Sequence, residues 1–126
     1  MHNFKNIIAW QKSRILVKDI YLLLTNFPVE ERYNLVSQIR RSAISIPSNI
    51  AEGSGRGTKK DFKRFLDIAI ASSFELETQM ILAMDLNYLL EHELKDFTNK
   101  IEEVQKLIYG LIKSLKIQIT NTKQTF

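Results

Sequence analysis

The chain has 126 residues, 44% of them hydrophobic and 25% charged, a composition typical of one globular domain covering residues 1–126. It contains no cysteine, which excludes disulfide bonds and thiolate chemistry, and no apolar run approaches the ~20 residues that cross a membrane. We therefore expect a cytoplasmic protein with no membrane contact. The net charge of +4 conceals alternating blocks, since residues 37–66 hold seven basic and two acidic side chains and residues 75–103 hold two and eight.

The first predicted helix covers residues 6–26. Small and apolar residues recur along one stripe at spacings of three and four, as in an amphipathic helix: Ala9, Ser13, Leu16, Ile20, Leu23 and Phe27. Two heptad-spaced sets flank this stripe: Ile8, Ile15 and Leu22 on one side, and Trp10, Val17 and Leu24 on the other. So wide an apolar surface indicates either a helix packed between two neighbours or one that also faces another subunit.

The second predicted helix covers residues 34–55, after Pro28 ends the first and a short turn follows it. Its apolar stripe keeps its phase across Pro47, which predicts a kink at this proline; the alternative is a break into two helices at Ile46. Three glycines follow, at positions 53, 55 and 57. We expect them to end the helix because glycine tolerates left-handed backbone.

The third and fourth predicted helices cover residues 58–89 and 91–117, and a polar tail, residues 118–126, is expected to fray. Thr58 is a candidate N-cap with Asp61 three residues further on. Nothing in the sequence indicates a strand. Four long helices with short connections predict an all-α fold, an up-down-up-down antiparallel four-helix bundle.

A polar stripe lies opposite the apolar stripe of the second helix: Arg41, Ser45, Asn49 and Glu52. If the second and third helices fold back as a hairpin, Arg41 reaches the level of Glu75, so an ion pair between them is expected. These side chains are interpreted as a structural polar network that fixes helix register. A ligand pocket and a subunit contact are the alternatives.

A second polar set surrounds the glycine-rich turn: Arg56, Lys59, Lys60, Lys63 and Arg64. Exposed basic side chains beside helix N-terminal amides bind phosphates, so these residues are candidates for nucleic-acid binding, with Arg40, Lys12 and Arg14 extending the surface. The set has no interleaved aromatic residues, so the binding it predicts is to the phosphate backbone, with weak sequence preference.

The sequence does not predict an enzyme. It has no Glu-x-x-His pair for a di-iron bundle site, no phosphate-binding loop and no calcium-loop spacing, so no metal site and no cofactor are expected.

Several motifs resemble one family. They are Trp10-Gln11-Lys12, Phe27-Pro28, Gln38-Ile39-Arg40-Arg41, the run from Ser45 to Gly53, and Glu75-Leu76-Glu77-Thr78. In this order and spacing the chain resembles the four-helix-bundle proteins encoded in intervening sequences of bacterial 23S ribosomal RNA genes. The resemblance implies a ring-like homo-pentamer. It also implies a distant relation to accessory proteins of diversity-generating retroelements, which pair with a reverse transcriptase and bind nucleic acid.

Two hypotheses for the function follow. The first is an oligomeric accessory protein that binds RNA or DNA through the basic turn. The second is an oligomeric scaffold that contacts another protein, such as a reverse transcriptase, and binds no nucleic acid.

Overall fold

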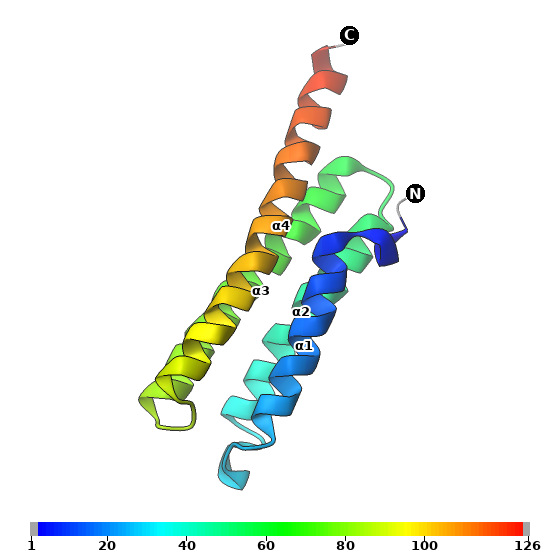
Figure 1. Ribbon diagram of the computed structural model, residues 1–126. Coiled ribbons are helices and arrows are strands. Elements are labelled where there is room, and N and C mark those ends of the chain that lie inside the picture. Colours follow the sequence, from blue (N-terminus) through cyan, green and yellow to red (C-terminus); the bar gives the residue numbers. More distant parts are fainter. Residues whose placement is uncertain (1–2, 125–126) are drawn as a thin grey trace.

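The computed structural model describes residues 3–124, with side chains to Asn121. It contains α1 (Ile8–Leu24), α2 (Leu35–Ser54), α3 (Lys59–Asp85) and α4 (Glu91–Gln124), with two 3-10 turns, η1 (Phe4–Asn6) and η2 (Val29–Glu31). No strand occurs in this part of the chain, so the predicted all-α fold of four helices is confirmed. Figure 1 shows consecutive helices running in alternate directions, with α1 beside α2 and α3 beside α4.

Two helix ends differ from the predicted ones. α3 ends at Asp85 because Asn87 has a left-handed backbone, with φ of 64°, and the amides of Asn87 and Tyr88 bond back to the carbonyls of Met84 and Ala83. α4 continues to Gln124, so residues 118–124, predicted to fray, are helical. The last two residues of the predicted tail lie outside the described part.

Pro47 lies inside α2, which is one helix from Leu35 to Ser54. The alternative of two helices separated at Ile46 is therefore wrong. Continuity is favoured by the apolar stripe, because Ala43, Ile46 and Ile50 on either side of the proline are all fully buried. A kink at this position stays a prediction.

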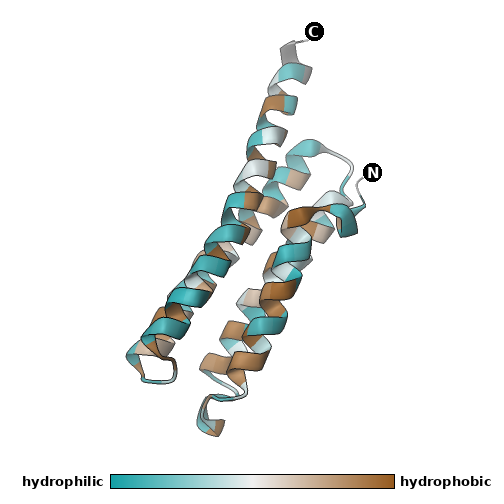
Figure 2. Ribbon diagram, in the orientation of Figure 1, coloured by the Kyte–Doolittle hydropathy of each residue, from teal (hydrophilic) through white to brown (hydrophobic). Residues whose placement is uncertain are grey.

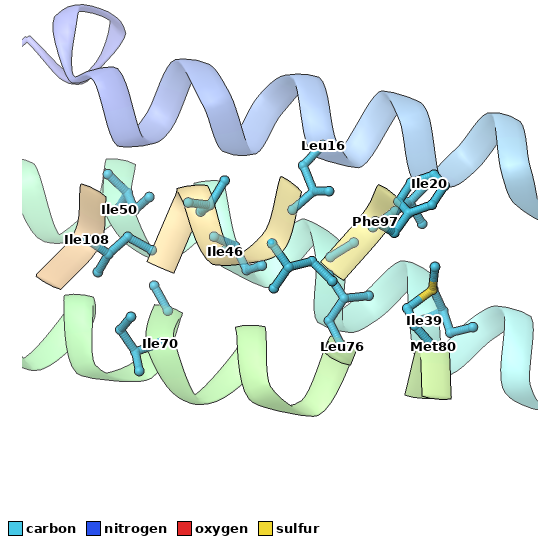
Figure 3. Close-up of a cluster of buried hydrophobic side chains, with 14 of the residues drawn as sticks. Leu16, Ile20, Ile39, Ile46, Ile50, Ile70, Leu76, Met80, Phe97 and Ile108 are labelled. Atoms are coloured by element: carbon cyan, nitrogen blue, oxygen red, sulfur yellow. The ribbon is translucent and has the colours of Figure 1, made fainter. Parts of the chain in front are cut away.

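The core lies between the four helices and follows the predicted stripes closely. Every member of the α1 stripe is buried, and so is every predicted core residue of α3 from Phe62 to Ala83. Figure 3 shows Leu16, Ile46, Leu76 and Ile108, one from each helix, within this cluster. In α4 the stripe is buried except at Leu94 and Leu111, which are half-buried and pack against the core.

Gly53 has a packing role that the sequence did not indicate. No glycine among the described residues has a positive φ, so the expected left-handed helix end is wrong. A Cβ on Gly53 would lie 2.7 Å from the Cβ of Phe65 and 3.0 Å from the ring of Phe62. Gly53 is therefore required because α2 and α3 approach closely before the turn between them.

Candidate nucleic-acid interface

The turn between α2 and α3 presents the basic residues predicted to bind nucleic acid, which we call the basic turn: Arg56, Lys59, Lys60, Lys63 and Arg64. All are exposed except Lys63, which is half-buried. The turn is closed by Thr58, whose hydroxyl oxygen accepts a hydrogen bond of 3.1 Å from the amide of Asp61, as the capping prediction required. Lys59 and Lys60 therefore occupy the first turn of α3.

Local carboxylates neutralise three of these five cations. Arg56 lies 3.1 Å from Glu52, Lys63 lies 2.8 Å from Asp67, and Arg64 lies 3.7 Å from Asp61. Within residues 3–121, the side chains of Lys59 and Lys60 form no ion pair or hydrogen bond. A phosphate can therefore bind to these two ammonium groups without first displacing a carboxylate.

Phe65 supports the two arginines of the basic turn. The guanidinium carbon of Arg56 lies 4.7 Å from the centroid of the Phe65 ring, and that of Arg64 lies 4.8 Å from it. Because Phe65 is buried, its ring restrains both guanidinium groups and is closed to stacking with a base. The Phe65 ring therefore positions the two guanidinium groups and does not contact a base. The groups of a nucleic acid that these arginines can contact are its phosphates.

The three residues expected to extend this surface lie in different places. Arg14 stacks on Trp10, with 5.7 Å to the ring, in the first half of α1, which Figure 1 places at the same end of the bundle as the basic turn. Lys12 instead pairs with Glu103 of α4 at 3.3 Å. Arg40 stacks on Tyr21 near the start of α2, about 21 Å along the helix axis from Ser54 at 1.5 Å per residue. Arg40 is therefore not part of the basic turn.

Two lysines of α4 reach this end of the bundle and were missed from the sequence. Gln105 of α4 bonds to Ser73 and Glu77 of α3, and the two helices run in opposite directions, so Lys116 comes level with the first turns of α3. Lys113 lies one turn earlier, and both lysines are exposed. The acid-free charge block of residues 104–126, combined with the antiparallel register, was the signal that could have identified them.

The residues expected to form one polar network lie in separate groups. Ser42 donates a hydrogen bond of 2.8 Å to Glu75, and Gln79 donates one of 3.3 Å to the same oxygen. Among the described residues Arg41 is exposed and has no polar partner, so the expected ion pair with Glu75 is absent. The reason is helical phase: Ser42, one position further along α2, is the residue that faces α3.

The second part of the network joins α2 to α3 near the middle of both helices. Asn49 donates to the carbonyl and the hydroxyl of Ser45, at 2.7 and 2.9 Å, and the Ser45 hydroxyl lies 2.8 Å from that of Ser72. The remaining member, Glu52, pairs with Arg56. Of these contacts only Ser45–Ser72 crosses from α2 to α3, whereas the Glu52–Arg56 pair is local and exposed; a role of the set in fixing helix register stays a prediction.

Ion pairs cross the seam between α1 and α4 near its surface, above the buried Leu16 and Val104. Lys100 lies 3.2 Å from Asp19 and 3.3 Å from Asp96, and Lys12 pairs with Glu103 further along. Burial alone would lower the pKa of Lys100, but the hydrogen bonds to Asp19 and Asp96 outweigh it and the pKa is raised. The Lys100 side chain therefore stays charged and bridges the two helices.

An exposed apolar stripe runs along α1 beside this seam. Ile8, Ile15 and Leu22 retain 58%, 54% and 61% of their accessible surface. Figure 2 shows hydrophobic stretches along α1 where the neighbouring part of α4 is mostly hydrophilic. The wide apolar surface of α1 has two possible explanations, packing between helices and contact with another subunit. Packing accounts for Trp10 and Val17, which contact the core. It does not account for the exposed stripe of Ile8, Ile15 and Leu22.

The fold and these motifs agree with the sequence comparisons. Residues 5–110 match the family described as 23S rRNA-intervening sequence protein. The chain belongs to this family. A solved structure of a protein of unknown function from the S23 ribosomal protein family of Bacteroides thetaiotaomicron VPI-5482 is 27% identical, with a TM-score of 0.78 over 84% of this chain and 96% of that one. No curated protein matches the chain.

Two further observations concern membranes and metals. None of the helices in the described part of the chain has a stretch long and apolar enough to cross a bilayer. Residues 3–121 also hold no group of three or more histidine, aspartate and glutamate side chains placed to bind a metal ion.

Proposed function

We propose that this protein is a non-enzymatic, homo-oligomeric accessory protein that binds RNA or DNA weakly and with little sequence preference. The observation that carries the proposal is the pair of ammonium groups of Lys59 and Lys60 at the exposed start of α3, which have no partner among the side chains that the structure describes. Lys116 from α4 adds positive charge at the same end, and Arg56 and Arg64 are held on Phe65 but are paired with Glu52 and Asp61.

The proposed contacts are to phosphates. Lysine is a flexible point charge that makes no fixed pattern of hydrogen bonds with a base edge, and the nearby aromatic ring is buried. The carboxylates of Glu52, Asp61 and Asp67 reduce the local charge, so one chain supplies only a weak site. Repetition of that site in an oligomer would raise the overall affinity through avidity.

The test is the salt dependence of binding to a labelled single-stranded RNA and to a DNA duplex. A Lys59→Gln/Lys60→Gln variant should weaken binding and reduce the slope of log K against log salt by about 1.4 to 1.8, two phosphate contacts at about 0.7 to 0.9 each. The matched control is Lys18→Gln/Lys95→Gln, which removes the same charge from exposed lysines elsewhere.

Equal effects of the two double variants would show that only net charge matters and would contradict a binding site at the basic turn. No binding by the wild-type protein at low salt would reject the nucleic-acid function altogether.

The second candidate function is a protein-interaction scaffold, and the observation that favours it is the exposed stripe of Ile8, Ile15 and Leu22. An apolar stripe of this kind on a helix builds oligomers or docks partner helices. A ring of five chains, with a reverse transcriptase or another protein as partner, is the form that the resemblance implies. The scaffold is favoured if the wild-type protein is oligomeric and binds no nucleic acid.

A further inference from the structure

A hollow of about 260 Å³ lies at the end of the bundle remote from the basic turn. It is bounded by the end of α1, the connection through η2 and the first turns of α2. Five of its lining residues are apolar and two are arginines: Leu24, Phe27, Pro28, Val29, Val36, Arg32 and Arg40. Leu24, Phe27 and Val36 belong to the core, so their packed side chains form a fixed apolar floor.

Arg40 is the unusual residue of this hollow. Its Nε atom is buried and has no hydrogen-bond partner, and its guanidinium forms no ion pair with any described residue. The Tyr21 ring, 5.2 Å from the guanidinium carbon, is its only described interaction. A guanidinium in a largely apolar wall is unfavourable when its charge is neither fully hydrated nor paired, so this hollow offers an anion a cation that no described carboxylate neutralises.

The carboxylate on the adjoining turn is already engaged. One oxygen of Glu31 accepts the amide of Leu35 at 3.1 Å, and the other lies 3.4 Å from the hydroxyl of Tyr88. Glu30 is exposed on the same turn. Arg32 at the rim stacks on Tyr33, with 5.5 Å between the guanidinium carbon and the ring. The hollow thus combines an apolar floor, an unpaired guanidinium in its wall and a second cation at its edge.

We infer that this hollow binds a carboxylate joined to an apolar side chain, presented by a segment of a partner protein. The two terminal nitrogens of the Arg40 guanidinium, which lines the hollow, each carry N–H groups, and this pair matches the two oxygens of a carboxylate. The apolar floor takes the side chain beside that carboxylate out of water. The volume, below the range usual for drug-sized ligands, fits one side chain and its acid group.

A nucleic-acid phosphate fits the site less well than this ligand. Phosphate binding relies on several cations facing a hydrated anion, and here the two arginines are outnumbered by apolar residues and accompanied by Glu30 and Glu31. The site is also separate from the basic turn, so the test of nucleic-acid binding does not affect this inference.

The experiment is an NMR titration of the full chain with small probes. N-acetyl-leucine carries a chain-end carboxylate, a leucyl-aspartate blocked as N-acetyl and C-terminal amide carries a side-chain carboxylate, and N-acetyl-leucinamide is the uncharged control. We expect a carboxylate probe to shift the amides of residues 24–40 with a dissociation constant in the millimolar range. The difference between the first two probes shows which kind of acid the site prefers.

Two matched variants locate the binding. Arg40→Gln should weaken binding of the carboxylate probe by about tenfold or more, because it removes a charge-assisted pair of hydrogen bonds. Arg41→Gln removes the same charge from the next residue, which is exposed and has no described polar partner, and should leave binding unchanged. Arg40 makes no hydrogen bond or ion pair with any described residue, so Arg40→Gln loses only the contact with Tyr21 and should unfold close to the wild-type urea concentration, which separates lost binding from lost folding.

Equal binding of N-acetyl-leucine and N-acetyl-leucinamide would overturn the assignment of a carboxylate. Equal losses in the two variants, or stronger binding of inorganic phosphate than of N-acetyl-leucine, would overturn the site.

Discussion

Gly53 shows how one residue sets the distance between two helices. Its hydrogen occupies the place where any side chain would meet Phe65 and Phe62 of α3. Helix propensity alone would favour alanine at this position by up to about 1 kcal/mol. The close approach of α2 and α3 opposes that preference, and it also brings Ser45 within hydrogen-bond distance of Ser72.

Replacing Gly53 with alanine should lower the free energy of unfolding by about 1 to 2 kcal/mol. Overpacking of the contact, about 1 to 3 kcal/mol, exceeds the gain in helix propensity. Urea denaturation measures the change. Gly57→Ala is the matched control, because a Cβ there has nothing within 4 Å, and it should be neutral or slightly stabilising. If the Gly53→Ala and Gly57→Ala proteins had the same free energy of unfolding, the close approach of α2 and α3 at Gly53 would not contribute to stability.

At the level of elements, buried polar side chains fix how α3 and α4 slide against each other. Gln105 donates one hydrogen bond of 3.0 Å to Ser73 and one of 3.2 Å to Glu77, within an otherwise apolar interface. Any sliding of α4 by one turn would leave these groups buried without partners. An apolar stripe alone tolerates such a shift, because the same spacing repeats along the helix.

Removing the Ser73 hydroxyl should destabilise the fold by about 1 to 2 kcal/mol, since Ser73→Ala takes away an acceptor for Gln105. Ser13 provides a matched control: it is equally buried, but its hydroxyl donates to the carbonyl of Trp10 in its own helix. Ser13→Ala should change stability by about 0.5 kcal/mol or less. Comparable losses in thermal or urea unfolding would contradict a register role for the Ser73–Gln105 contact.

At the scale of the whole molecule, the two sides of α1 behave differently. The side towards the core and α2 is buried, whereas the stripe of Ile8, Ile15 and Leu22 is more than half exposed. The seam next to it is held by the ion pairs of Lys12 and Lys100 with their partners. Exposed apolar residues in a row along one helix favour association of chains through this face.

Light scattering tests this association. The wild-type protein should be larger than a monomer, with five chain masses as the expectation from the family resemblance. Ile15→Asp/Leu22→Asp should dissociate it while circular dichroism stays helical, because both side chains are exposed in a single chain. Leu86→Asp, an exposed apolar position at the α3–α4 turn, is the control and should stay oligomeric. A monomeric wild-type protein would contradict the predicted oligomer and the avidity that the proposed nucleic-acid binding relies on.

The basic turn could be predicted from the sequence because its residues are close together in the chain and therefore lie close together in the fold. The basic turn is a continuous segment between two helices, so its exposure followed from the glycines and from Thr58. Arg40 and Lys116 show the limit of this reasoning. The charge of Arg40 predicts that it extends the basic turn, but it lies in the first turns of α2, far from that turn. Lys116 is distant in sequence from the turn but reaches the same end through the antiparallel run of α4.

The sequence by itself determined the four helices and the residues of their core, because a helix repeats every 3.6 residues and the buried face can be read from that period. It also determined the helix start at Thr58, which depends on a local hydrogen bond. Only the tertiary structure decided that Ser42 and not Arg41 meets Glu75, that Gly53 serves packing, and that Arg40 lies unpaired in a hollow. These features depend on the rotation and separation of packed helices, and a shift of one residue along a helix turns a side chain by about 100°.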